Sequence, residues 1–223
     1  MDIAPLNQKT GYVRWMKSQG LPIHSGHGMA DLRALEVAPY ARLGGQAAFI
    51  QLHGMQGITG GHIGEIAPGD ALKSERHLYE EVICILNGQG ATELWDDHGN
   101  KKMFEWNKWS LFAPPLNTTH RLLNGSREPV RFLAVTNAPL AFDIYRDEDF
   151  IFNCPYSFKD RYYGEDDYFE VGKKRYVSGM MTGFLTPETQ KRCIKYGATD
   201  YFGKPLDIPK LKLAVRAMLL HRS

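Results

Sequence analysis

Two stretches of the sequence contain side chains that are suited to binding a metal ion. The first stretch carries His77 and Glu81, and the second carries His120 further along the chain. Neutral imidazole and carboxylate groups suit divalent ions such as iron, manganese, nickel and zinc. Two histidines with one carboxylate leave coordination positions open for a substrate or for dioxygen. These residue types predict a site for one divalent metal ion, with His77, Glu81 and His120 as ligands.

The spacing within the first stretch fits a β-strand, in which successive side chains point to opposite faces. Four residues share one parity: Glu75, His77, Tyr79 and Glu81. A strand over residues 76–86 would turn these side chains toward one interior and Glu80 toward solvent. Each ligand has a simpler alternative, because a lone histidine is more often structural and a His–Glu pair can lie on a surface. The second stretch, with Pro115 and Asn117 before His120, favours the metal site.

Short strands are the elements that must position these side chains. Runs of alternating apolar residues predict strands at 47–53, 60–66, 76–86, 90–96, 101–105, 109–113, 119–123 and 130–136. Asn87-Gly88 and Asn124-Gly125 are hairpin signals between such runs. Strands this short and this close indicate an antiparallel sandwich or barrel over residues 46–140. We expect residues 1–45 to form an N-terminal arm with one helix near 11–18.

Both stretches resemble the paired motifs of the cupin superfamily. The first motif is matched, with a glutamate in place of its first histidine, at Gly69, Glu75, His77, Glu81 and Gly88. The second motif is matched, with an asparagine in place of its second glycine, at Pro115, Asn117, His120 and Asn124. Trp109 stands where that motif begins with glycine. The resemblance covers about residues 40–175 and implies a mainly β fold, the cupin-type antiparallel β-barrel or double-stranded β-helix.

The glutamate at the first ligand position leaves several roles open for Glu75. As a fourth ligand, it would make the site more anionic and favour manganese or iron over copper. Alternatively, Glu75 acts as a base, or it neighbours Arg76 without reaching the ion. Glu75 or Tyr79 would then be the catalytic group that moves a proton.

Other side chains near the motifs have two interpretations each. Several aromatic residues could line the mouth of the barrel, with core packing as the alternative: Tyr79, Trp95, Phe104, Trp106 and Phe112. His62 lies on a predicted strand that faces the site, so it could support the ligands. A surface position is the simpler expectation for His62.

The chain beyond the barrel divides in two. Residues 141–175 are rich in aromatic and charged side chains without periodicity, and we expect an extended segment that wraps the barrel surface. Residues 176–223 resemble the second half of a response-regulator receiver domain. Thr182 matches the switch threonine of that family, and Lys204 matches its phosphoryl-contacting lysine.

Local signals predict the elements of this receiver-like tail. Thr186 before Pro187 is a helix start with threonine as N-cap, and Asp207 caps a second helix. A short strand is expected at 199–202. The phosphoacceptor half of a receiver has no counterpart in the sequence, so we expect a short α/β appendage with a structural role and no phosphoryl switching.

Composition excludes several classes of function. The formal net charge is only +2 over 223 residues, which gives no electrostatic reason to expect nucleic acid or an anionic membrane as partner. No apolar run approaches the roughly 20 residues that cross a bilayer, and the N-terminus lacks the pattern of a secretory signal. The three cysteines form no C-x-x-C pair and suggest reduced thiols. We expect a cytoplasmic protein, and a homodimer because barrel edges need cover.

These features predict a metal-dependent cupin enzyme that acts on a small polar metabolite. With iron(II), the resemblance implies a dioxygenase that cleaves its substrate oxidatively. With manganese, nickel or zinc, the ion would act as a Lewis acid in lyase or isomerase chemistry. The alternative is a non-catalytic module that binds a small ligand without turnover. Cupins host many unrelated activities, so the fold alone does not decide between them.

Overall fold

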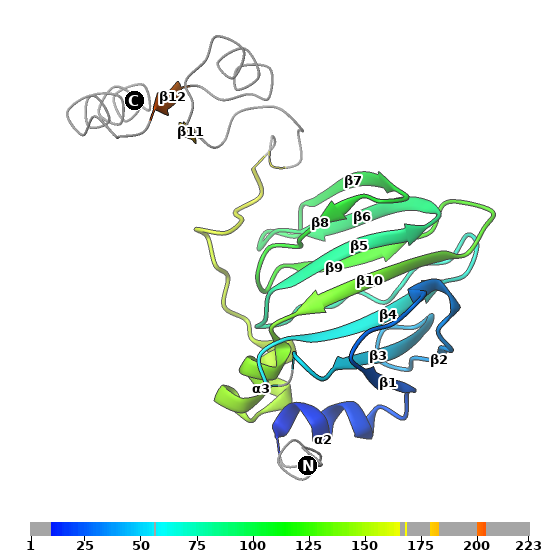
Figure 1. The fold of residues 1–223 in the computed structure, drawn as a ribbon. Coiled ribbons are helices and arrows are strands. Elements are labelled where there is room, and N and C mark those ends of the chain that lie inside the picture. Colours follow the sequence, from blue (N-terminus) through cyan, green and yellow to red (C-terminus); the bar gives the residue numbers. More distant parts are fainter. Residues whose placement is uncertain (1–9, 56, 166–167, 169–178, 183–199, 204–223) are drawn as a thin grey trace. The chain divides into compact units, whose positions relative to one another are not determined.

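The computed structural model describes residues 10–55, 57–165, 168, 179–182 and 200–203. They belong to two units, residues 1–168 and residues 169–223, and each unit is described by itself. The first unit is mainly β, with its helices gathered at one end of the strands (Figure 1). Among the described residues, no helix is long and apolar enough to cross a membrane.

Two sheets build the first unit. The larger sheet has seven strands, in the order β1-β3-β4-β10-β5-β8 with β2 paired to β3. Its strands are β1 Ile23–Gly26, β2 Ala38–Pro39, β3 Gln46–Leu52, β4 Gly60–Ile66, β5 Glu81–Asn87, β8 Leu111–Phe112 and β10 Val130–Thr136. The smaller sheet runs β7-β6-β9 and contains β6 Gln89–Trp95, β7 Lys101–Asn107 and β9 Thr119–Leu123. This mainly antiparallel fold is the cupin barrel that the motifs imply.

The two sheets share a buried apolar interior. All of its members except Leu72 come from strands of the two sheets: Ile66, Leu72, Ile83, Ile85, Trp106, Leu122, Val130, Phe132 and Ala134. Trp106 Nε1 donates a hydrogen bond to the Thr92 hydroxyl at 2.9 Å, so its polar group is satisfied inside the core. Phe104 and Phe112 pack against the same cluster. Core packing therefore accounts for these three aromatic residues.

The predicted strands match the observed ones closely, except before β5 and at β8. The strand predicted at 76–86 begins only at Glu81. Glu75 forms a single bridge with His120, after which the Leu78 amide donates to the Ile151 carbonyl at 2.9 Å. The chain thus leaves the sheet between residues 76 and 80, because its backbone bonds first to His120 and then to Ile151. Predicted strand 109–113 is likewise reduced to β8.

The N-terminal arm contributes more than the expected helix. Helix α2, Gly11–Ser18, begins at Thr10, whose hydroxyl accepts from the Val13 amide at 3.3 Å. β1 then pairs in parallel with β3, which places the arm in the larger sheet. A 3-10 turn, Leu32–Ala34, follows, and three apolar residues of this region cover the outer face of the sheet: Leu32, Leu35 and Val37.

Residues 138–153 form two helices, where we expected an extended segment from residue 141. Helix α3 spans Ala138–Tyr145 and helix α4 spans Glu148–Asn153. The Asp147 carboxylate caps α4 by accepting from the Phe150 amide at 2.9 Å. The aromatic side chains pack against α2, with the rings of Trp15 and Phe142 4.8 Å apart. Helices of six to eight residues can form without a long apolar period, which is why the sequence pattern missed them.

The second unit is described only at two strands. β11, Gly179–Thr182, runs parallel to β12, Asp200–Gly203. The observed β12 is displaced by one residue from the strand predicted at 199–202. Lys204 and the predicted helix starts at Thr186 and Asp207 lie outside the described residues. The resemblance of the tail to a receiver domain stays a prediction.

Candidate metal centre

Four side chains meet where the larger and the smaller sheet come together. Glu75, His77, Glu81 and His120 each offer one ligand atom, and these atoms lie within 4.8 Å of one another. Glu81 is the first residue of β5 and His120 the second of β9, so each sheet supplies a ligand. Glu75 reaches the site through its backbone bridge to His120. The structure thus brings together all four predicted ligands.

The two imidazoles are oriented for metal binding. His77 Nδ1 lies 2.8 Å from the Tyr79 carbonyl, and His120 Nδ1 lies 2.9 Å from the Thr118 carbonyl. A carbonyl only accepts, so each Nδ1 carries a proton, and each Nε2 is the ring atom that can bind a metal ion. Both Nε2 atoms are buried without a hydrogen-bond partner. Backbone carbonyls that hold the other ring nitrogen are typical of metal-ligating histidines.

Glu81 completes a set of three ligands. Its Oε2 atom lies 3.6 Å from His77 Nε2 and 3.7 Å from His120 Nε2. Ligand atoms about 2.1 Å from an ion are separated by roughly 3.0 to 3.4 Å in octahedral or tetrahedral geometry. These two distances would shorten by a few tenths of an ångström around an ion, and the two-histidine, one-carboxylate set matches the donor chemistry of iron, manganese, nickel or zinc.

Burying the ionisable side chains of this site costs free energy unless their charges are balanced. His77, Glu81 and His120 are 3%, 4% and 1% exposed. Burial acts to raise the pKa of the Glu81 carboxyl, but the nearby imidazoles of His120 and His77 hold it well below its usual range. Burial acts to lower the pKa of His120, yet Glu81 raises it. A proton on His120 and a bound cation therefore serve the same electrostatic need, which is to balance Glu81.

Tyr79 supports His77. The two rings are stacked, with centroids 3.8 Å apart and planes 4° from parallel. Burial raises the pKa of the Tyr79 hydroxyl well above its ordinary value, which keeps the hydroxyl protonated at neutral pH. The geometry gives Tyr79 an orienting contact with a ligand, and its role in moving a proton stays a prediction.

Arg42 is a site residue that the motifs did not indicate. Its Nη2 atom lies 2.6 Å from Glu75 Oε2. The two residues also line a cavity of about 500 Å³, together with Ser74, Arg76, Glu148, Asp149, Phe152 and Asn153. Glu75 therefore connects the four-ligand cluster to this cavity. Arg42 comes from the N-terminal arm, and no motif or spacing in the sequence could have related it to the ligands.

Comparison with known protein families shows which family the chain belongs to. The family described as auxin binding protein matches residues 34–176. The chain belongs to this family. It is a cupin family, in agreement with the motifs, and the matched segment contains Arg42 as well as the four clustered ligands. Comparison with the curated proteins gave no match.

Solved structures show weaker similarities. Oxalate decarboxylase from Lactobacillus farciminis, in complex with formate, is 19% identical over 48% of this chain and 32% of that chain, with a TM-score of 0.41. The cupin domain of Schizosaccharomyces pombe Cnp3 is 16% identical over 48% and 66%, with a TM-score of 0.39. The chain described here thus covers about a third of the length of the decarboxylase chain. At these scores the similarities carry no argument about activity.

His62 is half-buried on β4, where we expected a surface position. It sits on β4 opposite Phe49 and Ala134 and packs edge-on against Phe132, with ring centroids 5.9 Å apart. Burial lowers the pKa of its imidazole, although Glu81 and Glu75 act in the opposite direction. Trp95 is also half-buried, with the Arg121 guanidinium 5.6 Å from its ring centre.

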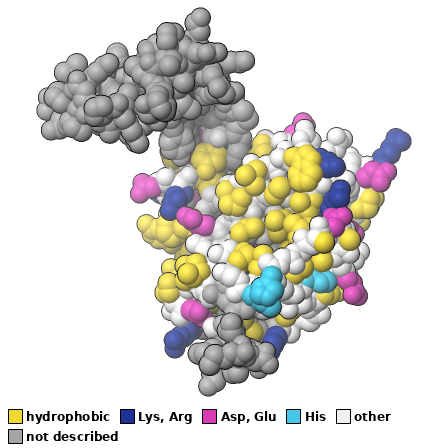
Figure 2. Space-filling view, viewed as in Figure 1, with side chains coloured by type: hydrophobic (Ala, Val, Ile, Leu, Met, Phe, Trp, Pro, Cys, Tyr) yellow, Lys and Arg dark blue, Asp and Glu magenta, His cyan; other side chains and the backbone are white. Residues whose placement is uncertain are grey.

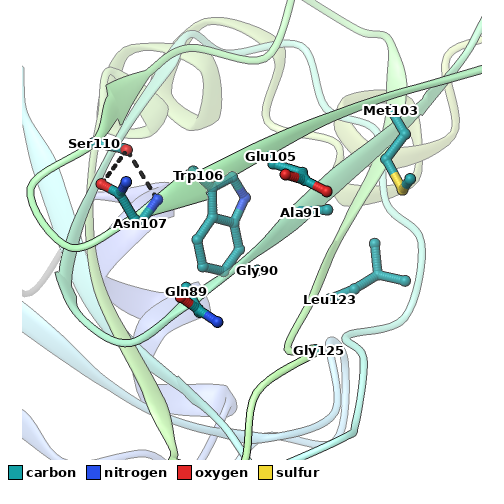
Figure 3. A pocket seen from close by; sticks show the side chains of 10 residues that line it. All are labelled: Gln89, Gly90, Ala91, Met103, Glu105, Trp106, Asn107, Ser110, Leu123 and Gly125. Carbon is teal, nitrogen blue, oxygen red and sulfur yellow. Dashed lines mark hydrogen bonds between the residues drawn. The ribbon is translucent and has the colours of Figure 1, made fainter.

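A larger cavity of about 680 Å³ lies at the smaller sheet (Figure 3). Its lining comes mainly from β6, β7 and the end of β9: Gln89, Gly90, Ala91, Met103, Glu105, Trp106, Asn107, Ser110, Leu123 and Gly125. None of the four clustered ligands lines it, and Glu105 is its only charged residue. This cavity therefore offers no donor set for a metal ion.

Proposed function

We propose that the protein binds one divalent metal ion through His77, Glu81 and His120 and acts on a small polar ligand at that ion. One observation carries the proposal: two buried Nε2 atoms without hydrogen-bond partners converge on one carboxylate oxygen. Buried polar atoms are nearly always satisfied, so a convergent unsatisfied set points to an absent ligand. Three protein ligands leave coordination positions open for the small molecule.

The chemistry depends on which ion is held. Iron(II) would supply redox chemistry with dioxygen, as in a dioxygenase, whereas manganese, nickel or zinc would supply a Lewis acid for a lyase or isomerase. Glu75 stands between the ligands and the cavity of about 500 Å³, so it is placed to accept a proton from a molecule that enters there. Tyr79 keeps the His77 ring in its ligating orientation.

A non-catalytic role is the second candidate, and the family description favours it. That description is auxin binding protein. In this role the same ion would hold a small ligand without turnover, and auxin is the first ligand to test. Incubating metal-loaded protein with the ligand separates the two candidates. Recovery of unchanged ligand supports binding alone, and a changed product supports an enzyme.

Metal-dependent stabilisation tests the shared part of both candidates. Titration with manganese, iron(II), nickel or zinc should raise the thermal midpoint of the wild type, because an ion that binds only the folded state stabilises it. The His77→Ala/His120→Ala double variant should show no such rise. Equal shifts in both proteins would contradict the ligand assignment.

We also propose that the protein forms a homodimer through the larger sheet. Figure 2 shows hydrophobic side chains gathered on the face that carries this sheet. Leu111 on the edge strand β8 is 68% exposed, and Trp109 beside it is 65% exposed. Unpaired edges and exposed apolar side chains invite a partner. Light scattering at micromolar concentration should give the mass of a dimer, and the mass of a monomer would contradict this proposal.

A further inference from the structure

Glu75 is fixed at its backbone, while its side chain has a choice of partners. The Glu75 amide donates to the His120 carbonyl at 2.9 Å, and the His120 amide donates to the Glu75 carbonyl at 2.8 Å. These two bonds hold the residue beside the ligands whatever its carboxylate does. The Glu75 carboxylate lines the cavity and already lies within 4.8 Å of the other ligand atoms, so a small rotation of the side chain decides which of the two it faces.

In the structure the Glu75 carboxylate is engaged by Arg42. Glu75 Oε2 accepts from Arg42 Nη2 at 2.6 Å. Glu81 lies within ion-pair distance of both imidazoles, whereas the only ion pair that Glu75 makes among the described residues is with Arg42. The carboxylate at the first ligand position is thus neutralised by a guanidinium.

Arg42 is itself held firmly. Its Nε atom donates to the Tyr40 hydroxyl at 3.0 Å, and its guanidinium carbon lies 4.3 Å from the centre of the Phe152 ring. The side chains of Arg42 and Glu75 are only 21% and 12% exposed. A pair that is mostly withdrawn from water is screened little, so it competes effectively with a nearby cation for the same carboxylate.

We propose that Arg42 determines whether Glu75 ligates the metal ion. While Arg42 holds Glu75, the ion has three protein ligands and open positions. When Arg42 is drawn away, Glu75 becomes the fourth ligand and one open position is lost. An anionic group that enters the cavity of about 500 Å³ would compete for Arg42, because Arg42 lines that cavity. This inference rests on the proposed metal site and adds a residue that controls its coordination number.

A double-mutant cycle in the full chain tests the inference. We would measure the dissociation constant of cobalt(II), and its visible absorption spectrum, for the wild type, Arg42→Gln, Glu75→Gln and the double variant. Arg42→Gln should free Glu75 to ligate and so tighten binding by about tenfold, the size of effect that outer-shell residues have but in the opposite direction. It should also shift the absorption bands as the coordination changes. In the Glu75→Gln background the same Arg42 change should alter affinity and spectrum little.

Two further variants complete the test. Arg33→Gln removes an exposed arginine whose partner is Asp31, and it should leave cobalt affinity unchanged. Arg42→Lys keeps the positive charge but loses the planar guanidinium, so it should also tighten cobalt binding, by less than Arg42→Gln does. This variant takes the place of Arg42→Gln if the latter does not fold. Unchanged affinity and spectrum on changing Arg42, or equal effects with and without Glu75, would overturn the inference. A wild type that binds no cobalt would instead overturn the proposed function.

Discussion

The ring of Tyr79 lies flat on the ring of His77, with 3.8 Å between the centroids, and the Tyr79 carbonyl accepts from His77 Nδ1. One residue thus fixes both the plane of the imidazole and the nitrogen that carries its proton. The free Nε2 atom is aimed at Glu81 Oε2 as a result. Support of this kind decides how well a ligand is preorganised.

Substitutions of Tyr79 should separate its orienting role from proton transfer. Tyr79→Phe keeps the stacked ring and the backbone carbonyl, so metal affinity should change little. Tyr79→Leu removes the stacked ring and should weaken metal binding by about tenfold. Calorimetric titration with zinc measures both. If the protein is an enzyme that uses the Tyr79 hydroxyl, Tyr79→Phe loses activity at full metal occupancy. Weakened binding in Tyr79→Phe would contradict the orienting role.

The metal-free protein should lose stability as pH rises above neutrality. The pKa of His120 is raised in the folded state, chiefly by Glu81 acting against burial. A raised pKa contributes stability below the unfolded value, and this contribution is lost as pH rises through the folded value. Thermal unfolding in a chelator, between about pH 6 and 9, measures this loss. The contribution of Glu81, whose pKa is lowered, disappears only in acid.

Metal binding should show the opposite pH dependence. An ion must displace the proton from His120, so affinity should increase as pH rises over the same range. His120→Gln should abolish both trends, which makes it the matched control. A metal-free wild type that becomes more stable than His120→Gln as pH rises would contradict the assigned pairing of His120 with Glu81.

Asn124 should be a structural residue of the second motif. It is 2% exposed, and its amide nitrogen donates to three carbonyls, those of Ile66, Ala67 and Glu128. Asn124→Ala leaves these buried groups unsatisfied, at a cost of about 1 to 3 kcal/mol for each strictly unpaired group. Chemical denaturation should show the loss of stability while zinc affinity per folded molecule stays unchanged. Reduced affinity at unchanged stability would contradict this assignment.

Much of the barrel could be predicted because buried and more exposed side chains alternate along its strands. In β10 every second side chain is buried, and this pattern is written directly in the residues Val130 to Thr136. The spacing of His77 and Glu81 likewise indicated a common site. The alternation of side chains correctly predicted that His77 and Glu81 lie close together. Residues 76–80 are nevertheless not a strand, because their backbone groups form hydrogen bonds with other elements.

Contacts between distant segments could not be predicted. Arg42 meets Glu75 because the N-terminal arm joins the larger sheet through β2 and β3, and no local pattern encodes that pairing. The partial burial of His62 depends in the same way on Phe132 from another strand. Helix α4 is capped by Asp147, but the partner that buries its Ile151 lies elsewhere in the chain. Sequence patterns report local periodicity and do not report which segments meet.

The most direct test of the metal site is elemental analysis. We would measure metal content by plasma mass spectrometry on protein purified without a histidine tag, beside the His77→Ala/His120→Ala double variant. We expect close to one equivalent of iron, manganese, nickel or zinc in the wild type and little in the variant. An absence of metal from both proteins, even after reconstitution, would contradict it.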